Sequence, residues 1–131
     1  MPEPDSGFGT WNGVESFEFV DGVRLHAIGG DQVLLCRVNY EPGKQVPRHA
    51  HEHTEQLMAV VEGSVSMTIG DETRELGVGD VVCVNRGIEH ELFSAGGVTF
   101  FEALSPVPLD HVPDRDRDLV LTEGGARHVA K

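Results

Sequence analysis

The chain has 131 residues, a net charge of −12 and 39% hydrophobic residues, which suits one domain with a core of ordinary size. Lys and Arg do not cluster, so the composition argues against a nucleic-acid partner and against an anionic membrane surface. No apolar run reaches the roughly 20 residues of a membrane span, and the N-terminus lacks a signal-peptide pattern. We therefore expect a cytoplasmic protein.

Three segments of different character divide the chain. Residues 1–21 hold five acidic residues and no basic one, and we expect an N-terminal arm there, with Trp11 packing on the body. Residues 22–105 carry the strand patterns and are expected to form the folded domain. Residues 106–131 are dense in alternating charge at first, and we expect a tail that packs on this domain or on a second copy.

The first expected strand covers residues 22–28, where apolar side chains alternate with Arg24 and His26 at the period of a half-buried strand. The second covers residues 31–40, whose even-numbered side chains share one face. Apolar residues expected inside are Leu34, Cys36, Val38, Tyr40, Met58, Val60, Val65, Met67 and Phe100. Such an interior fits a hydrophobic or aromatic small molecule that carries a few oxygens.

Six further strands are expected at 56–61, 64–69, 73–76, 80–84, 89–94 and 98–104. Glu62 and Gly63 stand between the first two of these, and this turn signal predicts a β-hairpin. About eight short strands with regular turns, and no helical periodicity, predict an all-β sandwich or barrel. Cys36 and Cys83 lie far apart within apolar runs, so both are expected to be small buried hydrophobes.

Three histidines and one glutamine form the most informative pattern. His49 and His51 are two residues apart, and alternate side chains of a strand point to one face, so their imidazoles aim at one point. Gln56 opens the next strand with the parity of its apolar residues, and His90 lies far downstream at an inward parity. A barrel that brings the three imidazoles together predicts one divalent metal site.

The fourth ligand is open between neighbours. Glu55 is adjacent to Gln56, and His53 lies in the turn after His51. We favour Gln56 over both. Gln56 has the parity of the apolar residues of its strand, which the adjacent Glu55 does not share, and His53 has the wrong parity to follow His51 on a regular strand. His53, if it is not exposed to solvent, is a candidate base at the rim of the site.

Residues 43–63 resemble the first motif of the cupin family, which runs from a Gly through His-x-His and a Glu or Gln to a second Gly. Residues 79–94 resemble the second motif, which runs from a Gly through Pro-x-Gly to a His and an Asn. Here Asn85 replaces the Pro and Ser94 replaces the Asn, and both departures affect turn stiffness more than ligation.

The resemblance implies the cupin double-stranded β-helix, also called the jelly-roll barrel, over about residues 22–104. It also selects Gln56 as the ligand beside the three histidines, by its spacing from Gly63. The pattern is similar to small single-domain cupins of two branches. One branch closes rings on aromatic polyketides in antibiotic biosynthesis, and the other opens unsaturated uronates in pectin degradation.

The expected chemistry follows from the ligands. Three imidazoles and a carboxamide are neutral, so a bound ion keeps its charge for Lewis-acid work on a carbonyl or enolate. Ligand type does not select the metal; we expect zinc, with Fe, Ni, Mn or Cu as alternatives. Tyr40, Glu102 and His26 are polar residues that could project inward, and we take Tyr40, Glu102 and His53 as the catalytic candidates.

Three functions from different classes compete. The first is a cyclase or isomerase of an aromatic polyketide, which needs no oxygen. The second is a dioxygenase that cleaves a diketone or flavonol-like substrate, and the third is a non-catalytic small-molecule binding protein. We also expect a homodimer, because open sheet edges need covering.

Overall fold

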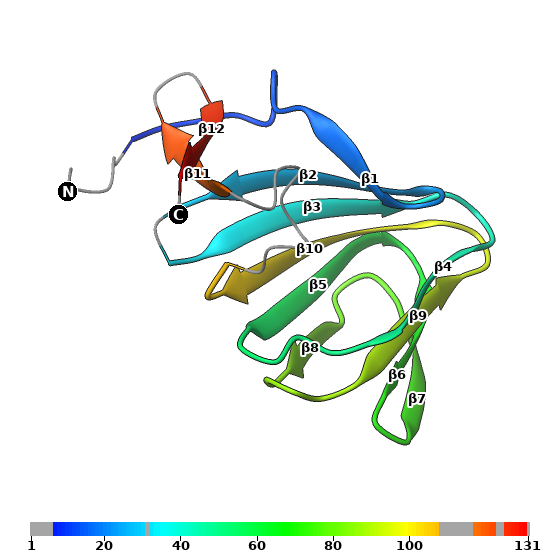
Figure 1. Cartoon of the computed structure of the whole chain (residues 1–131). Coiled ribbons are helices and arrows are strands. Elements are labelled where there is room, and N and C mark those ends of the chain that lie inside the picture. The colour runs from blue at the N-terminus through cyan, green and yellow to red at the C-terminus, as the bar shows by residue number, and fades with distance from the viewer. Residues whose placement is uncertain (1–6, 31, 108–116, 123–124, 131) are drawn as a thin grey trace.

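The computed structural model describes residues 7–30, 32–107, 117–122 and 125–130. Two antiparallel sheets face each other (Figure 1), and together they form the double-stranded β-helix that the sequence predicts. The six-stranded sheet has the order β1 (Ser16–Val20), β2 (Val23–Gly29), β3 (Leu34–Tyr40), β10 (Val98–Ser105), β5 (Glu55–Gly63) and β8 (Val81–Val84). The four-stranded sheet has the order β4 (Lys44–His49), β9 (His90–Ser94), β6 (Val65–Ile69) and β7 (Glu72–Leu76).

The core lies between the two sheets, as the alternating pattern predicts. Along β2 and β3 every second side chain is buried, since successive residues of a strand point to opposite faces. All nine residues expected inside are buried, and Leu34 and Cys36 are fully so. His26 is the exception among the inward candidates, because it shares the outer parity of β2 with Arg24.

The predicted hairpin between residues 56–61 and 64–69 is wrong. β5 pairs with β10 and β8, whereas β6 pairs with β7 and β9. The chain therefore crosses from one sheet to the other after Gly63, which has a φ of 75°, a conformation that glycine adopts without strain. The chain does change direction at Gly63, the last residue of β5, but such a signal alone does not indicate whether the strands on either side pair.

The sheet begins earlier than predicted, at Ser16 instead of residue 22. β1 pairs with β2, so the end of the expected arm is part of the barrel. Trp11 packs on Phe101 of β10, with ring centroids 5.9 Å apart, as expected for that residue.

The C-terminal segment contains a further pair of strands, β11 (Arg117–Thr122) and β12 (Gly125–Ala130). This pair lies against β2 (Figure 1). Residues 108–116, where the charge is densest, lie outside the described residues.

The two cysteines differ. Cys36 is buried as expected, but Cys83 is exposed, because it has the outward parity of β8, an edge strand of its sheet. The prediction of a buried Cys83 is therefore wrong. Among the described residues, no helix has the length and apolar character to span a membrane. The predicted homodimer stays a prediction.

Candidate metal centre

A β-bulge aims His49 into the barrel. The pairing of β4 with β9 shifts register between Val46 and His49, so the strand carries one extra residue there. In a regular strand Arg48 would share the buried face of Val46; the bulge turns Arg48 outward and His49 inward. Pro47 lies within the irregular stretch, where a residue without an N–H is tolerated.

His90 is placed by the pairing of β9. It lies opposite His49 on β4 and opposite Ile69 on β6, and it is fully buried. The side chains beside the two histidines are also joined, because Arg48 Nε donates a hydrogen bond of 2.8 Å to Glu89 Oε2. This exposed ion pair contributes little stability, but it connects the two strands next to the site.

His51 follows β4 and is fixed through its backbone. The amide of Gly87 donates a 2.9 Å hydrogen bond to the carbonyl of His51. Gly87 has a φ of 76°, a left-handed conformation that favours glycine. The turn that leads to His90 is thereby attached to the segment that carries His51.

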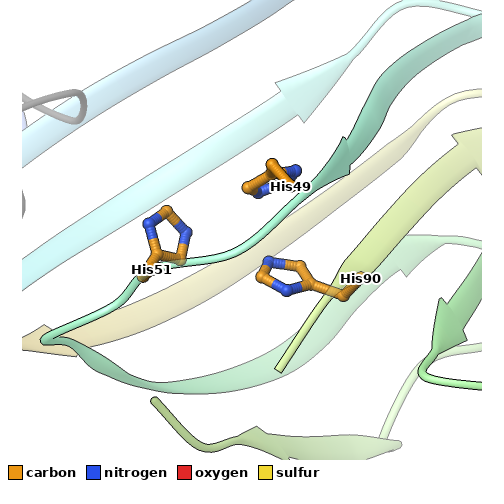
Figure 2. A group of neighbouring side chains, drawn as sticks. All are labelled: His49, His51 and His90. Atoms are coloured by element: carbon orange, nitrogen blue, oxygen red, sulfur yellow. The ribbon is translucent and has the colours of Figure 1, made fainter. Parts of the chain in front are cut away.

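The three imidazoles converge, as the sequence predicts (Figure 2). One ligand nitrogen of each of the three lies within 4.8 Å of the other two. The ring centroids are 5.1 Å apart for His49 and His51, 4.2 Å for His49 and His90, and 5.4 Å for His51 and His90. This spacing can hold a metal ion.

The hydrogen bonds of two rings fit a metal. His49 Nδ1 lies 2.7 Å from the carbonyl of Pro47, and His90 Nδ1 lies 3.0 Å from the carbonyl of Ile88. A carbonyl oxygen only accepts, so each Nδ1 carries the proton and donates it. In the neutral ring this leaves the Nε2 lone pair for a metal, which is the usual arrangement of a ligating histidine.

Gln56 reaches the same cavity from the opposite sheet. It is buried on β5, and its Nε2 donates a 2.7 Å hydrogen bond to Glu102 Oε2. Because a carboxylate accepts only, this bond fixes the amide orientation and leaves the oxygen facing the other way. Gln56 Oε1 is buried and makes no hydrogen bond in the structure, which fits a metal ligand.

Tyr40 lies on β3 beside these groups. Burial, together with the negative charge of Glu102, raises the pKa of the Tyr40 hydroxyl far above its ordinary value. The residue is therefore a neutral phenol at physiological pH and can donate a hydrogen bond. Its ring packs against Phe100, with centroids 5.7 Å apart.

All these polar groups line one cavity of about 20 Å³. Its polar lining residues are Tyr40, His49, His51, Gln56, His90 and Glu102. Phe19 of β1 also lines it, and the sequence reasoning missed this residue. The alternation of Phe17 and Phe19 with Glu18 was a strand signal that could have revealed it.

Two residues that compete with Gln56 lie outside the cavity. Glu55 is exposed at the start of β5. The His53 side chain is 90% exposed, with its Nε2 3.9 Å from Glu52 Oε2. The condition for a role at the rim, that His53 be shielded from solvent, is not met. The structure therefore does not bring His53 to the metal centre.

The two departures from the cupin motif make local hydrogen bonds. Asn85 Oδ1 accepts a 2.7 Å bond from the amide of Arg86. Ser94 is buried, and its hydroxyl donates a 2.6 Å bond to the carbonyl of Ser64. Both residues support turns, and neither lines the cavity of the histidines.

The fold and the centre define a β-barrel protein with three neighbouring histidines that could bind a metal ion. The family model described as "Cupin domain" matches residues 36–103. This is more than half of the chain, which therefore belongs to the cupin family. No curated protein matches the chain.

Solved structures with the same fold include KdgF from a Halomonas species, with 19% identity, a TM-score of 0.70, and coverage of 75% of this chain and 93% of that one. An RmlC-like cupin from Shewanella frigidimarina has 20% identity and a TM-score of 0.75, covering 85% of this chain and 100% of that one. Oxalate decarboxylase from Lactobacillus farciminis has 18% identity and a TM-score of 0.66, covering 73% of this chain and 32% of that one. These likenesses show the fold alone.

Proposed function

We propose that this cupin is a metal-dependent cyclase or isomerase of an aromatic polyketide, which acts by stabilising an enolate. The observation that supports the proposal most is the single cavity that three imidazoles, the Gln56 carboxamide and the Glu102 carboxylate line together. His49, His51, His90 and Gln56 are the proposed ligands, and zinc is the proposed ion. When bound, the ion supplies Lewis acidity to a substrate carbonyl.

Glu102 and Tyr40 are the proposed proton-transfer groups. Glu102 is buried beside the proposed ligand Gln56, where a carboxylate can take a proton from the carbon next to a carbonyl. Tyr40 is a neutral phenol at physiological pH and can donate a hydrogen bond to oxygen. One group accepts a proton and the other donates, which is what enolate formation requires.

The lining of the cavity favours a neutral substrate. None of its described lining residues is Lys or Arg, while Phe19, Leu25, Val38 and Phe100 are apolar. A uronate carboxylate would find no cationic side chain in this lining and would meet Glu102, so that only the bound ion would attract it. A β-diketone or poly-β-ketone brings carbonyl oxygens and no charge, which matches the lining better.

Proton abstraction provides the test. The probe is benzoylacetone, a neutral aryl β-diketone, in deuterated buffer under argon, with the protein loaded with zinc. We expect exchange of the methylene protons, followed by NMR, to exceed the protein-free rate by at least about a hundred-fold, the usual contribution of a positioned base.

Oxygen uptake on the same probe separates the alternatives. Turnover that consumes oxygen, requires Fe, Ni or Cu and is lost with zinc would replace the proposal with the diketone dioxygenase. Binding of the probe without exchange or oxygen uptake would leave a binding protein. Absence of stoichiometric metal after loading would remove all the metal-dependent functions together.

A further inference from the structure

We propose that the ring-bearing body of the substrate lies in a second and larger cavity, which we call the seam, between the β6–β7 hairpin and β8. The seam has a volume of about 410 Å³. Its lining includes Met67, Ile69, Glu72, Arg74, Leu76 and Val82. The hairpin and β8 lie at the same end of the barrel in Figure 1, on opposite sheets.

Size separates the two cavities. The cavity of the histidines has about 20 Å³, which is close to the minimum of roughly 10–15 Å³ that a single water needs. It is too small to hold an aromatic ring. The seam, at about 410 Å³, falls in the range of roughly 300–1,000 Å³ typical of small-molecule sites.

The strand register connects the seam to the metal centre. Ile69, which lines the seam, is the cross-strand partner of His90. Directly paired residues have Cβ atoms about 4.5–5.5 Å apart, so the wall of the seam adjoins a proposed ligand. On the other sheet Val82 pairs with Met58, one inward position along β5 from Gln56. The seam thus lies next to the strand positions of His90 and Gln56, and the proposed substrate extends its reacting end from there toward the histidines.

The chemistry of the seam indicates a neutral guest. Met67 and Leu76 are buried and, with half-buried Ile69 and Val82, give apolar walls. At the rim Arg74 makes an ion pair with Glu72, and register places both on the inward face, opposite Met67 and Ile69. Inward-facing charges can also have another role, because they protect an edge strand such as β7 from pairing with other chains. That role accounts for the charged pair but leaves the apolar cavity behind it unexplained.

Acidic residues dominate the rim. Glu75 and Asp80 also line the seam, so Arg74 is outnumbered three to one and an anionic guest is disfavoured. The inferred substrate class is a neutral molecule with one or two rings and a β-dicarbonyl end. The inference rests on the proposed function only for that reacting end; the seam as a ring-binding site stands on its own geometry.

Benzophenone is the probe for the seam, because it is neutral, has two rings and on irradiation inserts into nearby C–H bonds. We expect cross-links, mapped by peptide mass spectrometry on the whole chain, at Met67 and Val82. Labelling should be the same with and without zinc, since the probe has no dicarbonyl.

Val82→Trp fills the seam, and Cys83→Trp is its matched control on the outer face of the same strand. We expect Val82→Trp to reduce the labelling of Met67 at least about ten-fold, the effect of losing one well-fitted apolar contact, and Cys83→Trp to leave it unchanged. Val82→Phe, a smaller filling, serves if the Trp variant melts well below the wild type.

The outcomes separate the two proposals. Labels confined to other surfaces, such as the outer groove of Leu57 and Phe101, or labelling of Met67 that persists in both Val82 variants, would overturn the seam. Labelling of Met67 with no proton exchange on benzoylacetone would keep the seam and overturn the enolate chemistry. Exchange that Val82→Trp slows for benzoylacetone but not for acetylacetone, which has no ring, would support both.

Discussion

The four-stranded and six-stranded sheets face each other across the metal centre, but they bring different side chains to it. β4, the residues just after it and β9 supply the three imidazoles. β5, β10 and β3 supply Gln56, Glu102 and Tyr40. One sheet thus carries most of the proposed metal affinity, and the other carries the proton chemistry and the orientation of the last ligand.

This division makes the two properties separable by mutation. A change on the imidazole side should remove the ion, and with it everything that depends on the ion. A change on the six-stranded sheet should leave most of the metal in place and alter what the loaded protein does. Four experiments test that separation, in order of decreasing effect.

His51→Ala should have the largest effect. A four-ligand zinc site binds with roughly 10–16 kcal/mol, about 3 kcal/mol per ligand, so we expect affinity for zinc to fall more than about a hundred-fold. The thermal midpoint of the metal-free protein should change little, because the hydrogen bond that fixes this segment, from the Gly87 amide to the carbonyl of residue 51, involves only the backbone. Competition with a chromogenic chelator measures the affinity. His53→Ala is the control, and an equal loss there would contradict the proposed ligand set.

Glu102→Gln should stop the chemistry while the metal stays. The amide oxygen of the new side chain can still accept from Gln56 Nε2, but an amide is not a base. We expect deuterium exchange on benzoylacetone to fall at least about a hundred-fold, with zinc affinity within about three-fold of the wild type, well under the effect of removing a group that supports a ligand. Glu55→Gln controls for charge alone. If zinc affinity and the exchange rate decreased together, Glu102 would act by supporting the ligand Gln56 and not by transferring a proton.

Gln56→Leu should reduce zinc affinity by an amount between that of His51→Ala on one sheet and that of Glu102→Gln on the other. It removes the proposed fourth ligand and keeps the volume of the side chain, so we expect zinc affinity to decrease about ten-fold to a hundred-fold. The result should be smaller than for His51→Ala, because a carboxamide is the weaker ligand. Isothermal titration with zinc measures it, and unchanged affinity would show that Gln56 only positions Glu102.

The contribution of Tyr40 to the pH dependence of stability should be the smallest effect, and it should appear only at alkaline pH. Its pKa is raised above the ordinary value of 10.0 in the folded state alone. The unfolded chain therefore loses the phenol proton near pH 10 while the folded chain keeps it, so stability is full below that pH and decreases above it. Tyr40 is the one tyrosine of the sequence, so absorbance at 295 nm follows it directly.

Ionisation of the folded wild type at the ordinary pKa would contradict the burial of that hydroxyl. Tyr40→Phe should flatten the decrease in urea stability above pH 10. Glu102→Gln should lower the pKa of Tyr40, because it removes the negative charge that helps to raise it. That shift would link the two residues on the six-stranded sheet without any metal present.

Parity and motif spacing predicted much of this structure. The even-numbered residues of β3 are inside because side chains alternate in any strand, and this local rule needs no knowledge of the partner strands. The same rule put the imidazoles of His49 and His51 on one common face, and Gln56 on the inward face of its own strand. The glycine spacing then separated Gln56 from Glu55, and the structure places the first inside and the second in solvent.

What the sequence could not predict depends on contacts between distant strands. The bulge near Pro47 is visible only when β4 is laid against β9, and without it Arg48 and not His49 would share the inward face. The crossing after Gly63 looks like any hairpin turn until the partners of β5 are known. Phe19 was missed because a short strand at the sheet edge has no second signal beyond its alternation.

The crossing at Gly63 has a consequence for which ions the protein accepts. A Cβ at this position would collide with the carbonyl oxygen of Gly97, so the segment after β5 and the segment before β10 touch there, where both pass between the sheets. The three proposed imidazole ligands belong to β4, the residues just after it and β9. Their mutual distances therefore do not depend on the separation of the two sheets. Only Gln56 approaches from across the gap, so we expect the separation of the sheets at β5 to set the radius of ion that it can reach.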